Sequence, residues 1–156
     1  LVGSEMCIRD REKRLLKSMP FENEVGIIDG EYDYGDFLKT VRGFESLPEG
    51  GERCFRCYRL RLEETAKLAK EKGFDYFCTT LSISPLKNSQ KINEIGYDVA
   101  EKYGVAWLPS DFKKKEGYKR SIELSRQYNL YRQNFCGCAF SKAASDKMKE
   151  EGKTNE

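Results

Sequence analysis

The sequence predicts a single α/β domain built on a parallel sheet. Two helical patterns alternate with two short apolar runs over residues 54–108, and this alternation is typical of parallel sheets covered by helices. A glycine follows each helical pattern, at Gly73 and Gly104, where it is placed to end the helix. With 156 residues, of which 38% are hydrophobic, the chain is long enough to bury one core and too short for two comfortable domains.

The N-terminal part gives weaker signals. Residues 1–11 fit poorly with the rest of the chain, and we interpret them as non-native sequence, so Cys7 is not counted toward any site. Residues 12–18 have the pattern of a helical remnant, and residues 25–28 form a short β-branched run. Asp33 is placed to cap the next helix, because a short acidic side chain accepts hydrogen bonds from the first free amides of a helix.

The clearest helix is predicted over residues 54–72. This stretch contains no glycine or proline, and its apolar residues recur at helical spacing. Residues 74–81 then have the composition of a buried strand, which is followed by the loop 82–89. Cys78 lies inside the predicted strand, so we interpret it as a buried hydrophobic side chain rather than a ligand.

The alternation continues with a second helix over residues 89–103 and a second strand over residues 105–108. A further helix is predicted at about residues 120–127. Ligands of parallel sheets gather beyond the carboxyl ends of the strands. We therefore expect the segments after the two strands, around Thr80 and Asp111, to contribute to a site.

The composition indicates the limits of the domain and the class of protein. We place the domain at residues 12–145, and we expect the polar end of the chain to fray into a tail over residues 146–156. The 28 basic and 26 acidic residues leave a net charge of only +2, so bulk charge does not indicate a nucleic-acid binder. No apolar stretch is long enough to span a bilayer, and no leader pattern is present, so we expect a soluble, cytoplasmic protein without a membrane partner.

Six cysteines and no histidine limit the chemistry of any metal site to thiolates and carboxylates. Cys54 and Cys57 lie three residues apart at the start of a predicted helix, where the helix N-terminus lowers thiol pKa values. Cys136 and Cys138 form a second pair around Gly137, which permits a tight turn between two thiols. An all-thiolate site suits zinc or an iron-sulfur cluster, and the spacing alone leaves both open.

Two other interpretations of the cysteines remain. A structural zinc site would simply tie the C-terminal part to the long helix. A redox-active dithiol is less favoured, because a thioredoxin-like CxxC follows a strand directly, whereas the loop 49–52 precedes Cys54.

Basic and aromatic residues cluster near both cysteine pairs. Four arginines share the helix of the first pair, and five bases occur against one acid over residues 113–120. An isolated charge run is usually a solvated face, but interleaved aromatic residues favour RNA, whose bases stack on aromatic rings. Hydroxyls and a cation also gather after the first strand and suit an anionic or polar ligand: Thr79, Thr80, Ser82, Ser84 and Lys87. Asp111 is placed to bind metal, donate a proton or cap a turn.

Four motifs in order carry a family resemblance over residues 12–141. They are RCxxCYxLRL, TTLxISPxK, DFKK and YRQxxCGCxxS, and together they resemble the QueH-type epoxyqueuosine reductases. The resemblance implies a doubly wound α/β sheet similar to the adenine-nucleotide α-hydrolase (HUP) fold. It also implies a 4Fe-4S cluster with an adjacent mononuclear iron, and reduction of epoxyqueuosine to queuosine at the wobble position of tRNA. The expected partners are the tRNA anticodon loop and an unidentified electron donor.

The resemblance also assigns roles to individual residues. It implies that the four paired cysteines bind metal. As a separate hypothesis, Asp33 or Asp111 helps to ligate iron or relays protons. The residues expected to position the tRNA substrate are Thr79, Thr80, Ser84, Lys87, Lys113, Lys114, Tyr131, Arg132 and Gln133. Family members begin with a strand and a CCxPC-type motif that this sequence lacks, so we expect a chain truncated at its N-terminus that is unable by itself to assemble the complete centre. The alternative function is a zinc-thiolate module that binds RNA without catalysis.

Overall fold

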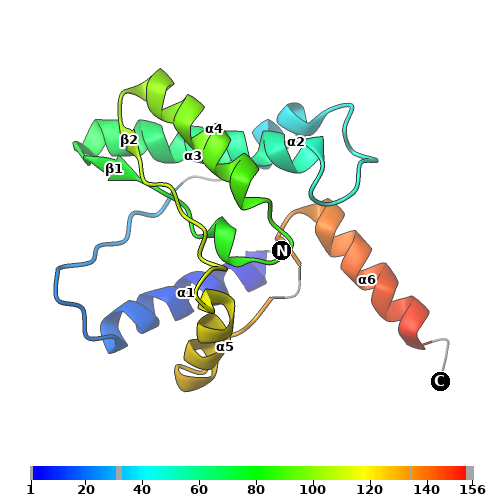
Figure 1. Cartoon of the computed structure of the whole chain (residues 1–156). Coiled ribbons are helices and arrows are strands. Elements are labelled where there is room, and N and C mark those ends of the chain that lie inside the picture. The colour runs from blue at the N-terminus through cyan, green and yellow to red at the C-terminus, as the bar shows by residue number, and fades with distance from the viewer. Residues whose placement is uncertain (1, 31–32, 134, 154–156) are drawn as a thin grey trace.

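The computed structural model describes the backbone of residues 2–30, 33–133 and 135–153, and the side chains of residues 10–30, 33–133 and 135–151. The side chain of Cys7 and the last three residues therefore lie outside the described part. Two long helices pack on each other and on a small sheet (Figure 1). The elements are α1 (Val2–Ser18), α2 (Tyr34–Val41), α3 (Glu52–Lys72), β1 (Tyr76–Phe77), the 3-10 turn η1 (Leu81–Ile83), α4 (Ser89–Tyr103), β2 (Ala106–Trp107), α5 (Gly117–Gln127) and α6 (Ala139–Lys153).

The sheet confirms an α/β arrangement with parallel strands. In β1 and β2, Tyr76 pairs with Ala106 and Phe77 pairs with Trp107. Both strands are shorter than predicted, and only one face of the pair is covered. Phe77 and Trp107 point into the core, whereas Tyr76 is 63% exposed on the other face.

The first apolar run was therefore wrongly predicted to be buried throughout. Cys78 follows β1 and is exposed, which corrects its interpretation as a buried hydrophobic side chain. Alternation of exposed and buried residues, rather than burial of every residue, describes this strand.

The core lies between α3 and α4 and follows the predicted periodicity. Leu62 and Ala66 of α3 are fully covered, as are Ile92 and Val99 of α4. The ring of Trp107 packs directly on Gly96, where an added Cβ would lie 2.3 Å from the indole. A side chain at position 96 would separate α4 from β2, so the core depends on this glycine.

The helix ends agree with the sequence. Gly73 and Gly104 adopt left-handed conformations, with φ of 71° and 70°, and their amides bond to the last turns of α3 and α4. Asp33 caps α2 as predicted, since its carboxylate accepts hydrogen bonds from the amides of Gly35 and Asp36 at 2.6 and 3.4 Å.

The outer segments differ from expectation at two points. The polar end of the chain, expected to fray, forms α6, which leads away from the rest of the molecule (Figure 1). Residues 25–28 lie in an irregular, exposed segment. Within the described residues, no helix has the length and apolar character required to cross a membrane.

Candidate metal and substrate site

The first cysteine pair lies in the first two turns of α3. Cys54 is buried, and its Sγ accepts a hydrogen bond from the amide of Gly50 at 3.3 Å. Cys57 is half-buried one turn later, where its Sγ accepts a hydrogen bond from Arg61 Nε at 3.5 Å. Both thiols therefore lie near the N-terminal end of α3, as the sequence predicts.

The second pair lies at the start of another helix. Cys138 directly precedes α6, and its Sγ accepts a hydrogen bond from the amide of Ser141 at 3.4 Å. The thiol therefore occupies the place of a capping side chain, a role that was not predicted because this stretch was expected to fray. Gly137 joins the pair with φ of +91°, which agrees with the tight turn predicted there.

A polar chain links the two cysteine segments. The Oε2 atom of Glu49 accepts a hydrogen bond from Ser141 Oγ at 3.2 Å, and the same hydroxyl accepts one from the amide of Cys136 at 2.8 Å. The other carboxylate oxygen pairs with Lys87 Nζ at 2.6 Å. The Lys87 side chain is 4% exposed and that of Glu49 is 31% exposed, so this ion pair is partly shielded from solvent.

Glu49 and Ser141 were not predicted to be functional residues. Two sequence signals could have drawn attention to them. Glu49 directly precedes the two glycines before α3, and Ser141 ends the YRQxxCGCxxS motif. Lys87 was expected to bind substrate, but its ammonium is already paired inside the protein.

The two thiols of the second pair differ in pKa. A hydrogen bond from Cys138 lowers the pKa of Cys136 to about 5, burial opposes this change, and the Lys87 cation reinforces it. The same bond raises the pKa of Cys138, because the pair shares one proton. Burial works against the charged form of Lys87, but its bonds to Glu49 and Cys136 outweigh that effect and raise its pKa. Cys136 is therefore the more acidic thiol of the pair, and the thiolate is the form that binds metals.

One buried group near the cysteines lacks a partner. Among the described side chains, the hydroxyl of Tyr58 is the buried polar atom without a hydrogen bond. Burial raises the pKa of Tyr58 to about 12, and charges on Lys87, Cys54 and Cys136 also act on it. Orphaned hydroxyls are uncommon in folded proteins and are often explained by a ligand.

The donor chemistry thus fits a thiolate-bound metal, but the side chains do not form a complete cage. Within residues 10–30, 33–133 and 135–151, no three cysteine, aspartate or glutamate side chains are gathered closely enough to hold a metal ion. Cys136 shares its surroundings with Cys138 and Tyr58, whereas Cys57 lines a different hollow together with Asp33.

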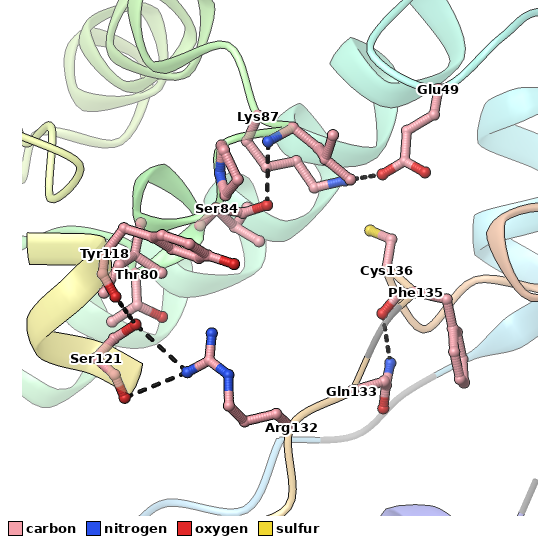
Figure 2. Close-up of a pocket in the computed structure, with 14 residues that line it drawn as sticks. Glu49, Thr80, Ser84, Lys87, Tyr118, Ser121, Arg132, Gln133, Phe135 and Cys136 are labelled. Carbon is pink, nitrogen blue, oxygen red and sulfur yellow. Dashed lines mark hydrogen bonds and ion pairs between the residues drawn. The ribbon is translucent and has the colours of Figure 1, made fainter. Parts of the chain in front are cut away.

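A cavity of about 480 Å³ opens beside Cys136 (Figure 2). It lies between the 80–87 segment, the start of α5 and the 132–136 segment. Arg132 crosses it, donating to the Ser121 carbonyl at 3.2 Å and to Ser125 Oγ at 3.0 Å. Five of the nine predicted substrate-binding residues line this cavity: Thr80, Ser84, Lys87, Arg132 and Gln133.

The other four lie elsewhere. Thr79 Oγ1 accepts a hydrogen bond from the Leu81 amide and shapes the loop after β1. Lys113 donates to backbone carbonyls of the same loop region. Lys114 lines a second hollow beside the end of β2, and the Tyr131 ring lies 5.4 Å from the guanidinium of Arg11.

The two predicted catalytic aspartates also lie apart from the cavity. Asp33 caps α2. Asp111 lines the hollow that contains Lys114 and pairs with Lys113 at 3.4 Å. Desolvation opposes the charged form of Asp111, but hydrogen bonds from Ser89 and Lys113 outweigh it and lower the pKa. The structure therefore brings neither carboxylate to Cys136.

The arginines of α3 do not form the free basic face that their number indicates. Arg53 is buried and donates to the Glu45 carbonyl at 2.7 Å. Arg59 pairs with Asp98 at 2.7 Å. These side chains hold the protein together, so the polar groups of the cavity become the better candidates for contact with a ligand.

Fold and site together define an α/β protein that presents paired thiols beside a polar cavity crossed by an arginine. Residues 4–144 match the family described as "Epoxyqueuosine reductase QueH". The chain belongs to this family.

Relatives named epoxyqueuosine reductase QueH agree with this assignment. The chain is 49% identical to the protein of Streptococcus pyogenes serotype M1 over 119 residues, which are 76% of this chain and 47% of the relative. Identity is 48% over 127 residues for Staphylococcus epidermidis, covering 78% and 53%. It is 42% over 115 residues for Thermotoga maritima, covering 72% and 60%. The chain thus spans about half the length of the curated relatives it matches.

Proposed function

We propose that the protein reduces epoxyqueuosine to queuosine at the wobble position of tRNA, the last step of queuosine biosynthesis, in the cytoplasm. Family membership supports this reaction. The observation that carries it is the position of Cys136, whose thiol lies at the wall of a polar cavity beside Lys87. A cysteine that binds a redox centre and also lines the substrate pocket would bring the centre next to its substrate.

The chemistry sets what the site must supply. Conversion of an epoxide to an alkene takes up two electrons and two protons and releases one water molecule. Cys54, Cys57, Cys136 and Cys138 are the residues that would hold a 4Fe-4S cluster and an adjacent iron, which supply electrons and bind oxygen when present. The electrons come from a separate donor protein or small reductant.

In this proposal, other side chains of the protein bind and orient the substrate. Arg132 and Gln133 enter the cavity from one side, and Thr80 and Ser84 from the other, so they form a polar frame for a modified base (Figure 2). Tyr131 and Lys114 lie outside this frame. We assign them to contacts with the surrounding anticodon loop, because aromatic rings stack on bases and cations bind phosphates. Asp33 and Asp111 remain proposed proton relays or iron ligands.

The same family assignment extends to the fold and domain. We propose that β1 and β2 belong to a doubly wound sheet resembling the HUP fold, within a domain over residues 12–145. A non-enzymatic zinc-thiolate module that binds RNA remains the competing function, and metal analysis separates the two.

The test is anaerobic reconstitution with iron and sulfide, followed by iron, zinc and acid-labile sulfide analysis. Bound iron and sulfide are expected, and both should fall in Cys54→Ala and Cys138→Ala. Cys78→Ala is the matched control, because this thiol is exposed and lies outside the proposed ligand set. A colourless protein with one tight zinc would support the zinc module instead. In a full-length relative, alanine at the positions of Cys54 or Cys138 should abolish queuosine formation.

A further inference from the structure

We propose that Glu49 and Ser141 are positioning residues that hold Cys136 and Cys138 in place beside Lys87. Three segments far apart in the chain meet at this point. They are the loop before α3, the loop before α4 and the start of α6. The hydrogen bond between Glu49 and Ser141 spans 92 residues of sequence, so it closes the arrangement.

Each polar group at this junction has a defined partner. Ser141 Oγ donates to the Glu49 carboxylate and accepts from the Cys136 amide, at 3.2 and 2.8 Å. The Ser141 amide donates to Cys138 Sγ at 3.4 Å. One serine therefore contacts both halves of the Cys136–Cys138 turn, through its side chain and its backbone.

Glu49 also pairs with Lys87, and its neighbour Gly50 contacts the first cysteine pair. Its second oxygen pairs with Lys87 Nζ at 2.6 Å, and Figure 2 shows the Sγ of Cys136 turned toward this ion pair. One residue later in the chain, the amide of Gly50 donates to Cys54 Sγ at 3.3 Å. The Glu49–Gly50 segment thus contacts the first cysteine of one pair and, through Ser141, both cysteines of the other.

Burial makes this arrangement specific. Ser141 is 5% exposed and the Lys87 side chain 4% exposed, so an unpaired hydroxyl or ammonium here would be costly. A carboxylate satisfies both at once, because it accepts from two donors. The assignment to ligand positioning rests on the proposed function, since that function makes Cys136 and Cys138 metal ligands.

Hydrogen exchange of the metal-free 156-residue chain tests the positioning directly. Ser141→Ala removes the acceptor of the Cys136 amide, so the peptide that contains residues 135–138 should exchange roughly fivefold faster or more. Ser141→Thr keeps a hydroxyl and should restore the original rate. Ser145→Ala, a similarly buried serine one turn further along α6, should leave this peptide unchanged.

Glu49→Ala should have the same effect as Ser141→Ala, and the double variant should add little, because both substitutions break one chain of hydrogen bonds. Glu49→Gln keeps one acceptor oxygen and replaces Glu49→Ala if the alanine variant does not fold. Glu45→Gln, in the same loop with an exposed side chain, controls for loss of one negative charge. A merely destabilised chain would also exchange faster in the α3 and α4 core.

The second measurement is release of bound iron to a chelator after anaerobic reconstitution. Ser141→Ala and Glu49→Ala should release iron several-fold faster than the unsubstituted chain, and Ser141→Thr should not. Unchanged exchange at residues 135–138, or faster exchange with unchanged iron release, would overturn the positioning role. If the unsubstituted chain takes up no iron, iron binding by these four cysteines alone fails, while the exchange result still decides whether Glu49 and Ser141 hold the cysteine turn.

Discussion

The ammonium group of Lys113 donates a hydrogen bond to the backbone carbonyl of Lys87 at 3.1 Å. A second bond runs to the carbonyl of Ser82 at 3.0 Å, and the Asp111 carboxylate lies 3.4 Å away. Lys113 therefore joins the segment after β2 to the loop that presents Lys87. Its neighbour Lys114 instead lines the hollow beside this segment, so two adjacent lysines of one motif have different surroundings.

We predict that Lys113→Ala lowers the free energy of unfolding by about 1–2 kcal/mol, because hydrogen bonds from a cation to partly buried carbonyls are lost. Urea denaturation measures the change. Lys114→Ala is the matched control and should stay within about 0.5 kcal/mol of the unsubstituted chain, as surface substitutions usually do. Equal effects of the two substitutions would show that Lys113 has no special role in the loop.

Gly96 gives a second prediction about stability. Alanine normally favours a helix over glycine by about 1 kcal/mol, but here its Cβ would lie 2.3 Å from the Trp107 ring. Gly96→Ala should therefore destabilise the protein by about 1–3 kcal/mol as the ring is displaced. Thermal unfolding measures this, and Trp107→Leu should reduce the penalty in the double variant. A stabilised Gly96→Ala would contradict the close packing of α4 on β2.

Local signals explain how much of the fold was predictable. The α3 and α4 helices combine apolar periodicity with a glycine stop, and Gly73 and Gly104 take the left-handed conformations that such a stop requires. The start of α6 has a thiol, Cys138, where a serine, threonine, aspartate or asparagine usually signals a cap, so a polar helix was predicted to be a frayed tail.

The site was predictable only in part. Spacing identified both cysteine pairs, because thiols two or three residues apart converge through local geometry. Glu49 and Ser141 meet across 92 residues, and no local pattern specifies such a contact. Lys87 and Lys113 were predicted to be ligand-binding cations. Their pairing with Glu49 and with backbone carbonyls was not predicted, because only the tertiary structure determines it.

Asn93 connects α4 to the segment after β2, and we predict that it is a stabilising residue. Its Oδ1 atom accepts hydrogen bonds from Trp107 Nε1 and the Ser110 amide at 3.1 and 3.0 Å, and its amide nitrogen donates to the Ser110 carbonyl at 3.0 Å. Asn93→Ala should cost about 2–3 kcal/mol of unfolding free energy, since three partners lose their bond. Asn88→Ala, which removes the exposed cap of α4, should cost only about 1 kcal/mol. Chemical denaturation compares the two variants.

Asn93 has hydrogen-bond partners for its polar side-chain atoms, whereas within the described residues Tyr58 does not. Its hydroxyl is buried, and it is without a hydrogen-bond partner among the residues that the structure describes. Tyr58→Phe removes this hydroxyl and keeps the ring, so the metal-free chain should be unchanged in stability or gain about 1 kcal/mol. Differential scanning calorimetry of the metal-free protein measures the shift. Phe substitution at Tyr103, a partly buried residue against the same core, is the control and should leave the midpoint nearly unchanged. A loss of stability in Tyr58→Phe would mean that the hydroxyl is satisfied in the metal-free protein, whereas a gain would leave its donor available to a group bound by the cysteines.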